Sequence, residues 1–224
     1  MNKPLNIFYH LLCINDGVER FTQTYNKIKK YKLLESIEKI FVNCVGEHQL
    51  KFSESISHLP KVEIILGEND KNESETINLM REFAINNDGF SLYLHAKGVW
   101  RSKTHLNRRN KVCGECLDSY IDFMEFFVIE KFYHCIEMLK TYKTCGCNLM
   151  RSKVGHSYYS GNFWWTRNDY IASLPECEDT RKAPEHFINA VDDSHKNLHT
   201  SIFGYPTNLK KVLPRDSYES KVDY

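Results

Sequence analysis

A histidine, a lysine and a glycine lie close together at the end of an apolar run, in the segment YLHAKG at residues 93–98. Lys97 can place a positive charge on a diphosphate, and Gly98 lets the backbone approach the same group closely. His95 can bind a metal, donate to a phosphate oxygen or serve as an acid. An ordinary strand end with an exposed lysine would carry the same residues, so the segment alone leaves both interpretations open.

A second segment, HSYYSGNFWW at residues 156–165, combines aromatic and small polar residues. Flat aromatic faces stack on sugar rings, while Ser, Asn and His side chains hydrogen-bond to hydroxyls. Both tryptophans could equally be core residues, and because neighbours in a strand face opposite ways, at most one is expected to face a ligand. The residues that we expect to bind an acceptor are His156, Ser160, Gly161, Asn162, Trp164 and Trp165.

Glu185 follows Pro184 at the start of a predicted helix. A carboxylate there could be the general base that deprotonates an acceptor hydroxyl. Because the helix dipole stabilises negative charge at a helix N-terminus, a capping glutamate explains the same position. His186 and His199 are further polar residues for which a structural role is the simpler expectation.

Basic residues gather between positions 100 and 111, where no acidic residue occurs. We expect Arg101 to help hold an anionic nucleotide, although a solvated loop would have the same composition.

Alternating strand and helix patterns must position these residues. Apolar runs predict strands at residues 5–12, 37–45, 62–66 and 90–95, and helical spacing predicts helices at 19–31 and 73–86. This order is typical of an open α/β sheet with helices on both faces. Because ligands bind beyond the carboxyl ends of the strands in such sheets, we expect a ligand near Asn15, Asp16 and two later segments, residues 67–70 and 95–98.

The second half has a different pattern. Residues 110–141 read as a long helix or two helices, residues 145–149 as a short strand, and residues 184–191 as a final helix. The tail beyond Pro206 is polar and is expected to be peripheral. One domain over residues 1–224 is the simplest division.

Composition excludes some classes of function. The chain has 224 residues and a net charge of +1, with 30 basic against 29 acidic residues. A general nucleic-acid binder would show a basic excess, so no nucleic-acid partner is expected. No apolar stretch approaches the roughly 18 residues of a transmembrane segment, and the N-terminus lacks a signal-peptide pattern. We therefore expect a cytoplasmic protein, in the host cytoplasm if it is viral.

The eight cysteines have two interpretations. Cys113 and Cys116, with Cys145 and Cys147, could supply four zinc ligands. However, the first pair falls at the start of a helical pattern, where no loop for a zinc knuckle is evident. Without a secretory signal a disulfide framework is not expected either, so we favour buried thiols that behave as small hydrophobes.

Together these segments resemble a family of glycosyltransferases with the GT-A fold. The resemblance is carried by YLHAKG after NNDG, by the helical segment IDFMEFFVIEKFYHCIEML, and by CGCN, HSYYSGNFWWTRNDYIASLP and APEHFI. Members occur in bacteria and in large DNA viruses, including chlorella-virus enzymes that build capsid glycans. The resemblance covers roughly residues 5–205, and SGNFWW is its most specific block.

The resemblance implies a GT-A-like, Rossmann-like open mixed sheet, with residues 1–100 binding a nucleoside-diphosphate sugar and residues 101–224 binding a glycan acceptor. Such enzymes usually carry an Asp-x-Asp metal motif where this chain has His95-Ala96-Lys97. Lys97 is therefore expected to replace the metal's charge. No metal is expected to be required, although Mn²⁺ or Mg²⁺ could bind with His95 or His199 as ligands. Glu185 is similar in position to the base of inverting GT-A enzymes, which favours inversion.

The missing Asp-x-Asp also supports an alternative, a carbohydrate- or nucleotide-binding protein without catalysis. A nuclease or nucleotidyltransferase would need strand-end carboxylates for two metals, and this chain offers scattered ones such as Asp70 and Glu75. A zinc-binding interaction module is a more distant possibility.

Overall fold

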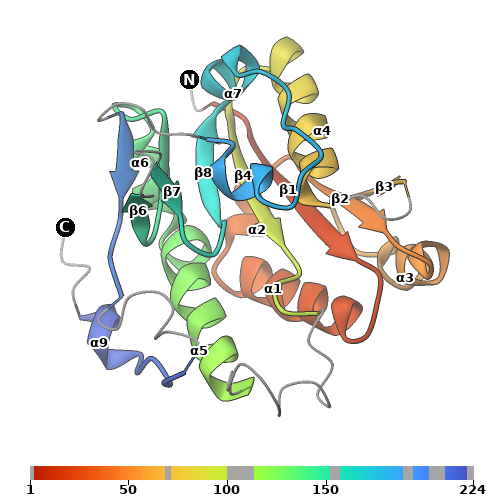
Figure 1. Cartoon of the computed structure of the whole chain (residues 1–224), viewed down its shortest axis with the longest axis horizontal. Coiled ribbons are helices and arrows are strands. Elements are labelled where there is room, and N and C mark those ends of the chain that lie inside the picture. The colour runs from red at the N-terminus through yellow and green to blue at the C-terminus, as the bar shows by residue number, and fades with distance from the viewer. Residues whose placement is uncertain are drawn as a thin grey trace.

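The computed structural model describes residues 3–68, 72–99, 114–151, 157–188, 194–201 and 210–220. In this part of the chain a seven-stranded mixed sheet has the order β3-β2-β1-β4-β8-β5-β9. Strands β3, β2, β1 and β4 are parallel, and β8 runs antiparallel to both β4 and β5. Figure 1 shows α4 and α7 on one side of this sheet and α1 and α5 on the other. The expected open α/β sheet with helices on both faces is confirmed.

The first half follows the predicted order of strands and helices closely. Its elements are β1 Leu5–Leu12, α1 Gly17–Lys30, α2 Leu33–Ser36, β2 Lys39–Val45, α3 Gln49–Ile56, β3 Val62–Leu66, α4 Glu73–Asn86 and β4 Phe90–His95. Helices α2 and α3 are short, and their sequences carry too few turns for a periodic pattern to stand out. The predicted strands and helices are otherwise present, with boundaries that agree within two residues.

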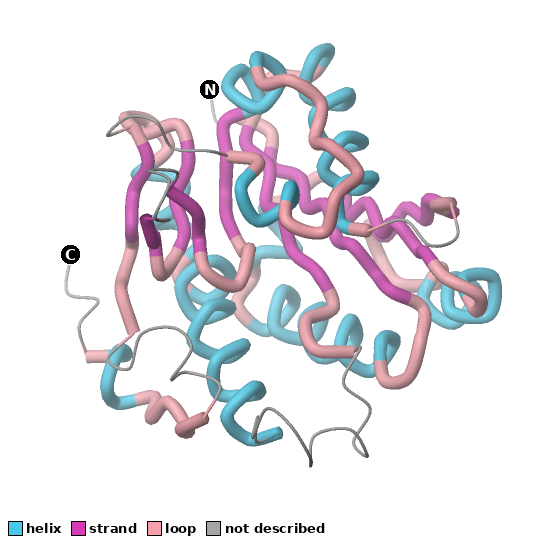
Figure 2. The backbone as a smooth tube through the Cα atoms, in the orientation of Figure 1, coloured by secondary structure: helices cyan, strands magenta, loops and turns pink. Residues whose placement is uncertain are grey.

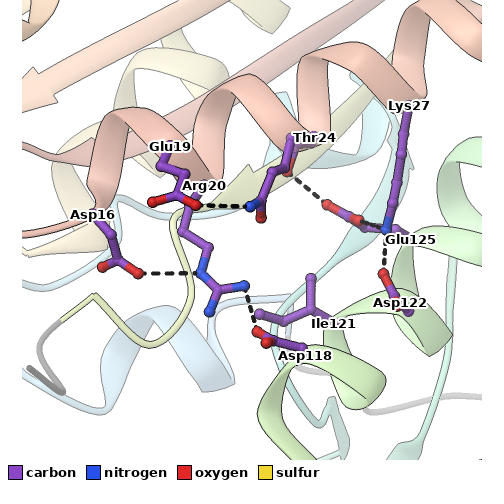
Figure 3. Close-up of a pocket in the computed structure, with 10 residues that line it drawn as sticks. Asp16, Glu19, Arg20, Thr24, Lys27, Asp118, Ile121, Asp122 and Glu125 are labelled. Carbon is purple, nitrogen blue, oxygen red and sulfur yellow. Dashed lines mark hydrogen bonds and ion pairs between the residues drawn. The ribbon is translucent and has the colours of Figure 1, made fainter. Parts of the chain in front are cut away.

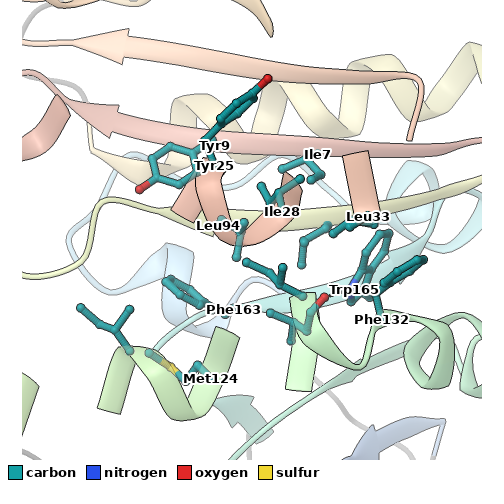
Figure 4. Packing of buried hydrophobic residues seen from close by; sticks show 14 of the residues in the cluster. Ile7, Tyr9, Tyr25, Ile28, Leu33, Leu94, Met124, Phe132, Phe163 and Trp165 are labelled. Carbon is teal, nitrogen blue, oxygen red and sulfur yellow. Dashed lines mark hydrogen bonds between the residues drawn. The ribbon is translucent and has the colours of Figure 1, made fainter. Parts of the chain in front are cut away.

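Helices pack on both faces of the sheet because alternate strand residues point to opposite sides. On one face Ile7 and Leu94 contact a core that includes Ile28 of α1 and Leu33 of α2 (Figure 4). On the other face Phe8 packs with Ile77 of α4 in a separate cluster. The strands in the middle of the sheet are therefore buried on both sides, as their continuous apolar runs predict.

The second half adds the remaining strands of the sheet and a small two-stranded sheet, β6-β7. Figure 2 shows these strands beside the helical segments that follow β4. The elements are α5 Gly114–Glu125, the π-helical turn η2 Phe126–Glu130, α6 Phe132–Met138, β5 Thr144–Gly146, β6 Leu149–Arg151, β7 Ser157–Tyr159, β8 Trp164–Arg167, α7 Asn168–Ser173, α8 Ala183–His186, β9 His195–Asn197 and α9 Asp216–Glu219.

Some predictions for this half were wrong. The strand expected at residues 145–149 divides into β5 and β6, because Asn148 adopts a left-handed conformation with φ 51°. The tail is not peripheral throughout, since Tyr218 of α9 is buried against the rings of Phe123 and Phe126. Of the helix expected at 184–191, α8 accounts for residues up to His186, and residues 189–191 lie outside the described part.

Trp164 and Trp165 are both core residues, each with no exposed surface. Trp165 donates from Nε1 to the Val128 carbonyl oxygen at 2.8 Å, on the face of α1 and α5. Trp164 stacks on Tyr93 with ring centroids 5.2 Å apart, on the face of α4. The interpretation of both as core residues, which the sequence left open, is therefore confirmed, and their expected role in binding an acceptor was wrong, because β8 lies inside the sheet with helices over both faces.

The cysteines of the described segments are buried and free. Burial raises the pKa of the Cys145 and Cys147 thiols well above the usual range. Their interpretation as small buried hydrophobes is confirmed, while Cys113 lies outside the described residues. No helix in the described segments combines the length and apolar character needed to cross a bilayer.

The core position of Trp165 leads to a stability prediction. Replacing Trp165 by Ala removes a fully buried indole and leaves the Val128 carbonyl without its donor. We expect the free energy of unfolding to fall by about 3–5 kcal/mol in urea titrations. Tyr133→Ala, at a residue that is 67% exposed, is the control and should change the free energy of unfolding by less than about 0.5 kcal/mol. Equal losses in both variants would contradict the assignment.

Candidate functional site

Polar side chains form a row across the carboxyl ends of three parallel strands. His95 of β4 pairs in register with His10 of β1, and His10 pairs with Asn43 of β2. Two residues earlier, Tyr93, Phe8 and their neighbours form an aromatic row on the same face. The row of polar residues thus lies where the apolar packing against α4 ends, next to the first turn of that helix.

Glu73, the first residue of α4, connects this row to the turn before β8. Its Oε2 accepts hydrogen bonds from Tyr93 Oη at 3.0 Å and from Asn162 Nδ2 at 2.7 Å. Its Oε1 lies 3.2 Å from His95 Nδ1. We call Glu73, Tyr93, His95, Lys97 and Asn162 the carboxyl-edge cluster. The side chains of Glu73 and His95 are 26% and 11% exposed, so the cluster reaches the surface.

The carbonyl oxygen of Gly161 brings the two predicted motifs together. It lies 3.1 Å from His95 Nε2 and accepts from Lys97 Nζ at 3.3 Å. Gly161 has φ 98°, and a Cβ on it would lie 2.2 Å from the sulfur of Met124. A glycine is therefore needed here both for the backbone conformation and for the space.

Burial and neighbouring charges set the protonation of the cluster. Burial would raise the pKa of Glu73, but the nearby His95, His10 and Lys97 side chains lower it below its usual value. Burial and the Lys97 charge lower the pKa of His95, while the Glu73 carboxylate opposes them. Near pH 7 the cluster therefore holds a carboxylate at Glu73 and a neutral imidazole at His95.

Burial also lowers the pKa of His10, to about 4, although the Glu73 carboxylate acts in the opposite direction. The residue is 6% exposed, and its ring Nδ1 lies 2.9 Å from Thr76 Oγ1 of α4. His10 is thus a neutral, hydrogen-bonded histidine in the strand next to His95.

The structure places Asn15 beside this edge and Asp16 facing away from it. Asn15 Nδ2 donates to the Val99 carbonyl oxygen at 2.7 Å, which ties the loop after β1 to the loop after β4. Asp16 instead lies 3.6 Å from Arg20 within α1. The expected meeting of these two strand ends is present, through Asn15.

Asp16 lines a cavity of about 360 Å³ between α1 and α5 (Figure 3). Its charged side chains pair with one another: Arg20 contacts Asp118 at 2.6 Å, and Lys27 contacts Glu125 at 2.5 Å and also Asp122. Burial raises the pKa of Glu125, which also accepts from Thr24 at 2.6 Å. This groove joins two helices through ion pairs and lies on the opposite face of the sheet from Glu73.

Several other predicted site residues have structural contacts. Tyr120 Oη donates to the Ser160 carbonyl at 2.8 Å, and a Cβ on Gly98 would lie 2.4 Å from Leu117. The ring of His199 stacks on Phe127 with centroids 5.4 Å apart. Arg101 and His156 lie outside the described residues.

Glu185 is exposed on α8, which packs against α4 and β7. Between described residues, no hydrogen bond or ion pair joins it to the carboxyl-edge cluster. In the same described segments, no three His, Cys, Asp or Glu side chains gather as a metal site. Both ring nitrogens of His95 face protein oxygens: Nε2 lies at hydrogen-bond distance from the Gly161 carbonyl oxygen, and Nδ1 lies at ion-pair distance from Glu73.

Sequence reasoning missed Glu73, Tyr93 and His10 as site residues. Glu73 stands directly after Asn72, whose Oδ1 accepts from Ser74 N at 2.8 Å as a helix cap. A carboxylate at that position is common because of the helix dipole, so it gave no separate signal. A signal for His10 was present in the sequence. It stands two residues after Phe8 in the same strand, so the two side chains share the α4 face of the sheet.

A protein-family comparison matches residues 8–212 to a family described as a domain of unknown function, DUF8361. The chain belongs to this family. No curated protein matches the chain.

Among solved structures, the DUF8361 chain is similar to 4-diphosphocytidyl-2C-methyl-D-erythritolsynthase from Anaerococcus prevotii DSM 20548. The sequence identity is 10%, the TM-score is 0.45, and the match covers 96% of this chain and 95% of the other. A likeness of this degree decides nothing about function, and the fold follows from the sheet topology itself.

The buried state of His10 predicts how the stability of this DUF8361 chain depends on pH. Between about pH 6.5 and pH 4 the unfolded chain binds a proton at His10 that the folded chain does not, so stability falls as the pH is lowered. Relative to His10→Asn, which keeps a polar partner for Thr76, the native protein should lose about 3 kcal/mol across this range. Urea unfolding of both proteins at several pH values measures the difference, and parallel profiles would disprove the effect.

Proposed function

We propose that this protein transfers a sugar from a nucleoside-diphosphate sugar to a hydroxyl group of a glycan acceptor. The observation that carries the proposal is the convergence of His95 and Lys97 on the Gly161 carbonyl oxygen. It brings the segment suited to a diphosphate next to the segment suited to a sugar. The resemblance of both segments to GT-A glycosyltransferases supports the same reading.

The sheet topology supports a nucleotide at this edge. Strand β1 pairs with β2 on one side and with β4 on the other, so the chain order reverses between β1 and β4. In open α/β sheets such a switch point leaves a crevice beyond the strand ends, where nucleotides bind. Asn15 and the loop that carries Lys97 lie there, joined through Val99.

Charge at this edge suits an anionic leaving group. Lys97 is half-buried and its ammonium lies at the end of β4, where GT-A enzymes usually place a metal-bound diphosphate. A fixed cation in a partly desolvated position stabilises the charge that develops on a departing diphosphate. We therefore propose transfer without a required metal, with Lys97 supplying the positive charge. Mn²⁺ or Mg²⁺ could still add to it.

The proposed reaction is a single displacement. The acceptor oxygen forms a bond to the anomeric carbon, the bond from that carbon to the diphosphate oxygen breaks, and its electron pair stays on the diphosphate. The acceptor oxygen attacks the face opposite the diphosphate, which inverts the anomeric carbon, and its proton passes to the carboxylate of Glu185. Glu185 is supported by the packing of its helix. The ring of His186, the next residue of α8, lies 5.2 Å from that of Tyr158 in β7, which belongs to the segment expected to bind the acceptor.

One observation favours a second candidate function, a carbohydrate- or nucleotide-binding protein without catalysis. Trp164 and Trp165 are both fully buried, so neither indole forms a stacking surface for a sugar, and of the two kinds of binding this favours binding of a nucleotide. Such a protein would bind donor nucleotides without releasing sugar from them.

Activity with a panel of UDP-, GDP- and dTDP-sugars tests the proposal. We expect one nucleotide class to stabilise the protein in thermal-shift assays and to be hydrolysed slowly, with Mn²⁺ and also with EDTA. Lys97→Met should weaken donor binding by about 10- to 100-fold, because a charged hydrogen-bond donor is lost. Lys51→Met, at an exposed lysine of α3, is the control. Binding without any sugar release would favour the second function, and no response at all would refute both.

Glu185→Gln tests the proposed base. We expect kcat for transfer to an acceptor to fall by about 10²- to 10⁴-fold while donor binding is kept, because the amide cannot take the proton. Glu178→Gln, on the exposed loop before α8, should leave the rate unchanged. Turnover at the native rate in the Glu185 variant would exclude this residue as the base.

A further inference from the structure

We propose that Glu73 is a positioning residue that holds the His95 ring in place and favours its protonated form when the diphosphate of the donor binds beside it. This inference rests on the proposed function of the same site. It assigns a role to a residue that no motif marked, and it makes His95 the second positive charge beside Lys97.

The two nitrogens of His95 both face oxygen atoms. Nδ1 lies 3.2 Å from Glu73 Oε1, and Nε2 lies 3.1 Å from the Gly161 carbonyl oxygen. A neutral imidazole has one N–H, so either tautomer leaves one nitrogen lone pair directed at an oxygen. The imidazolium carries a proton on each nitrogen, which suits an ion pair with Glu73 on one side and a hydrogen bond to the Gly161 carbonyl on the other, so the contacts around the ring fit the charged form.

Charged and titratable groups from several elements surround His95 and oppose one another. Glu73 of α4 favours the charged ring, while Lys97 in the loop after β4 and burial of the ring disfavour it. His10 faces it from β1, and Tyr93 of β4 stacks nearby with centroids 6.3 Å apart. These influences act on the same ring in opposite directions, so an added negative charge beside it favours the protonated form.

A bound diphosphate would supply that charge. Its negative oxygens would offset the repulsion from Lys97 and would attract a proton onto His95. The proton comes from solvent when the donor binds. Both ring nitrogens keep their protein oxygens, so the imidazolium acts on the diphosphate through its charge while the bond to the anomeric carbon breaks. Together, Lys97 and the imidazolium would place two positive charges on the leaving group, as a divalent cation does elsewhere.

Glu73 also helps to orient the Gly161 carbonyl group, which faces His95 and Lys97. It accepts from Asn162 Nδ2 at 2.7 Å, and Asn162 has a left-handed φ of 59° directly after Gly161. Holding that side chain fixes the turn whose carbonyl receives His95 and Lys97. One carboxylate therefore sets both the ring and the turn opposite it.

A second glutamate on the same helix turn provides a matched control. Glu75 accepts from the Glu68 amide at 2.9 Å and from Asn43 Nδ2 at 3.1 Å. It is also a carboxylate close to the strand ends, yet its hydrogen bonds go to the β2 and β3 side. Glu75→Gln removes the same charge from the same helix turn without touching the partners of Glu73.

The first test is proton uptake on binding, measured by titration calorimetry in buffers of different ionisation enthalpy near pH 7, with inorganic pyrophosphate as the probe. We expect the native protein and Glu75→Gln to take up close to one proton per bound anion and Glu73→Gln to take up far less. The native measurement needs no variant, so it decides even if Glu73→Gln does not fold. Binding without proton uptake by the native protein overturns the inference and leaves the proposed function standing.

If pyrophosphate does not bind, the same titration is made with the sugar nucleotide that does.

The second test is NMR of histidine-labelled protein, with the His95 signal assigned by its loss in His95→Asn. Glu73→Gln should lower the midpoint of His95 titration by about one pH unit or more, whereas Glu75→Gln should leave it within a few tenths of a unit. An unchanged midpoint in Glu73→Gln overturns the inference.

Kinetics with the identified donor separate positioning from simple folding. Glu73→Gln should lower kcat by about 100-fold with a smaller change in KM, and Glu73→Asp should recover part of it. Equal losses in Glu73→Gln and Glu75→Gln would contradict a specific role. Failure of the proposed function looks different, since no sugar nucleotide would then bind or turn over while the NMR titration could still link Glu73 to His95.

Discussion

An aromatic row and a polar row of side chains lie next to each other on the α4 face of the sheet. The position of the site depends on the boundary between these two rows. The aromatic row contains Tyr93, Phe8 and Phe41, and the polar row contains His95, His10 and Asn43. Because side chains on one face of a strand repeat every second residue, the polar row is fixed at one step beyond the packed rings. The rings cannot move without disturbing the core, so they hold the polar row at the sheet edge.

The turn at Gly161 lies between the two helix layers and is held by both. Tyr120 and Met124 of α5 contact Ser160 and Gly161 from one side, and Glu73 of α4 holds Asn162 from the other. Buried polar groups are costly unless they are hydrogen-bonded, and here each donor finds an acceptor across elements that are distant in sequence. The contacts within the site are therefore also contacts that join the two faces of the domain.

The parallel half of the fold could be predicted from the sequence because its signals are local. Residues 5–12 and 90–95 are continuous apolar runs, and Phe21, Tyr25 and Ile28 follow helical spacing. The short strands of the second half carry three or four residues each, too few for a pattern, and their pairing depends on left-handed residues such as Asn148. Of the site, Lys97, His95 and Gly161 were visible as motif residues. Glu73 was not, because its importance comes from the sheet order that brings α4 over the strand ends.

The buried position of Trp164 has a consequence for how the site can be observed. Its indole nitrogen donates to Asn162 Oδ1 at 2.7 Å, and Asn162 Nδ2 in turn donates to Glu73 Oε2. The fluorescence of an indole responds to changes in nearby charge and in its own hydrogen bond. A chromophore inside the core is thus two hydrogen bonds from the carboxylate at the sheet edge. One of the three tryptophans of the chain is thus connected by hydrogen bonds to that edge.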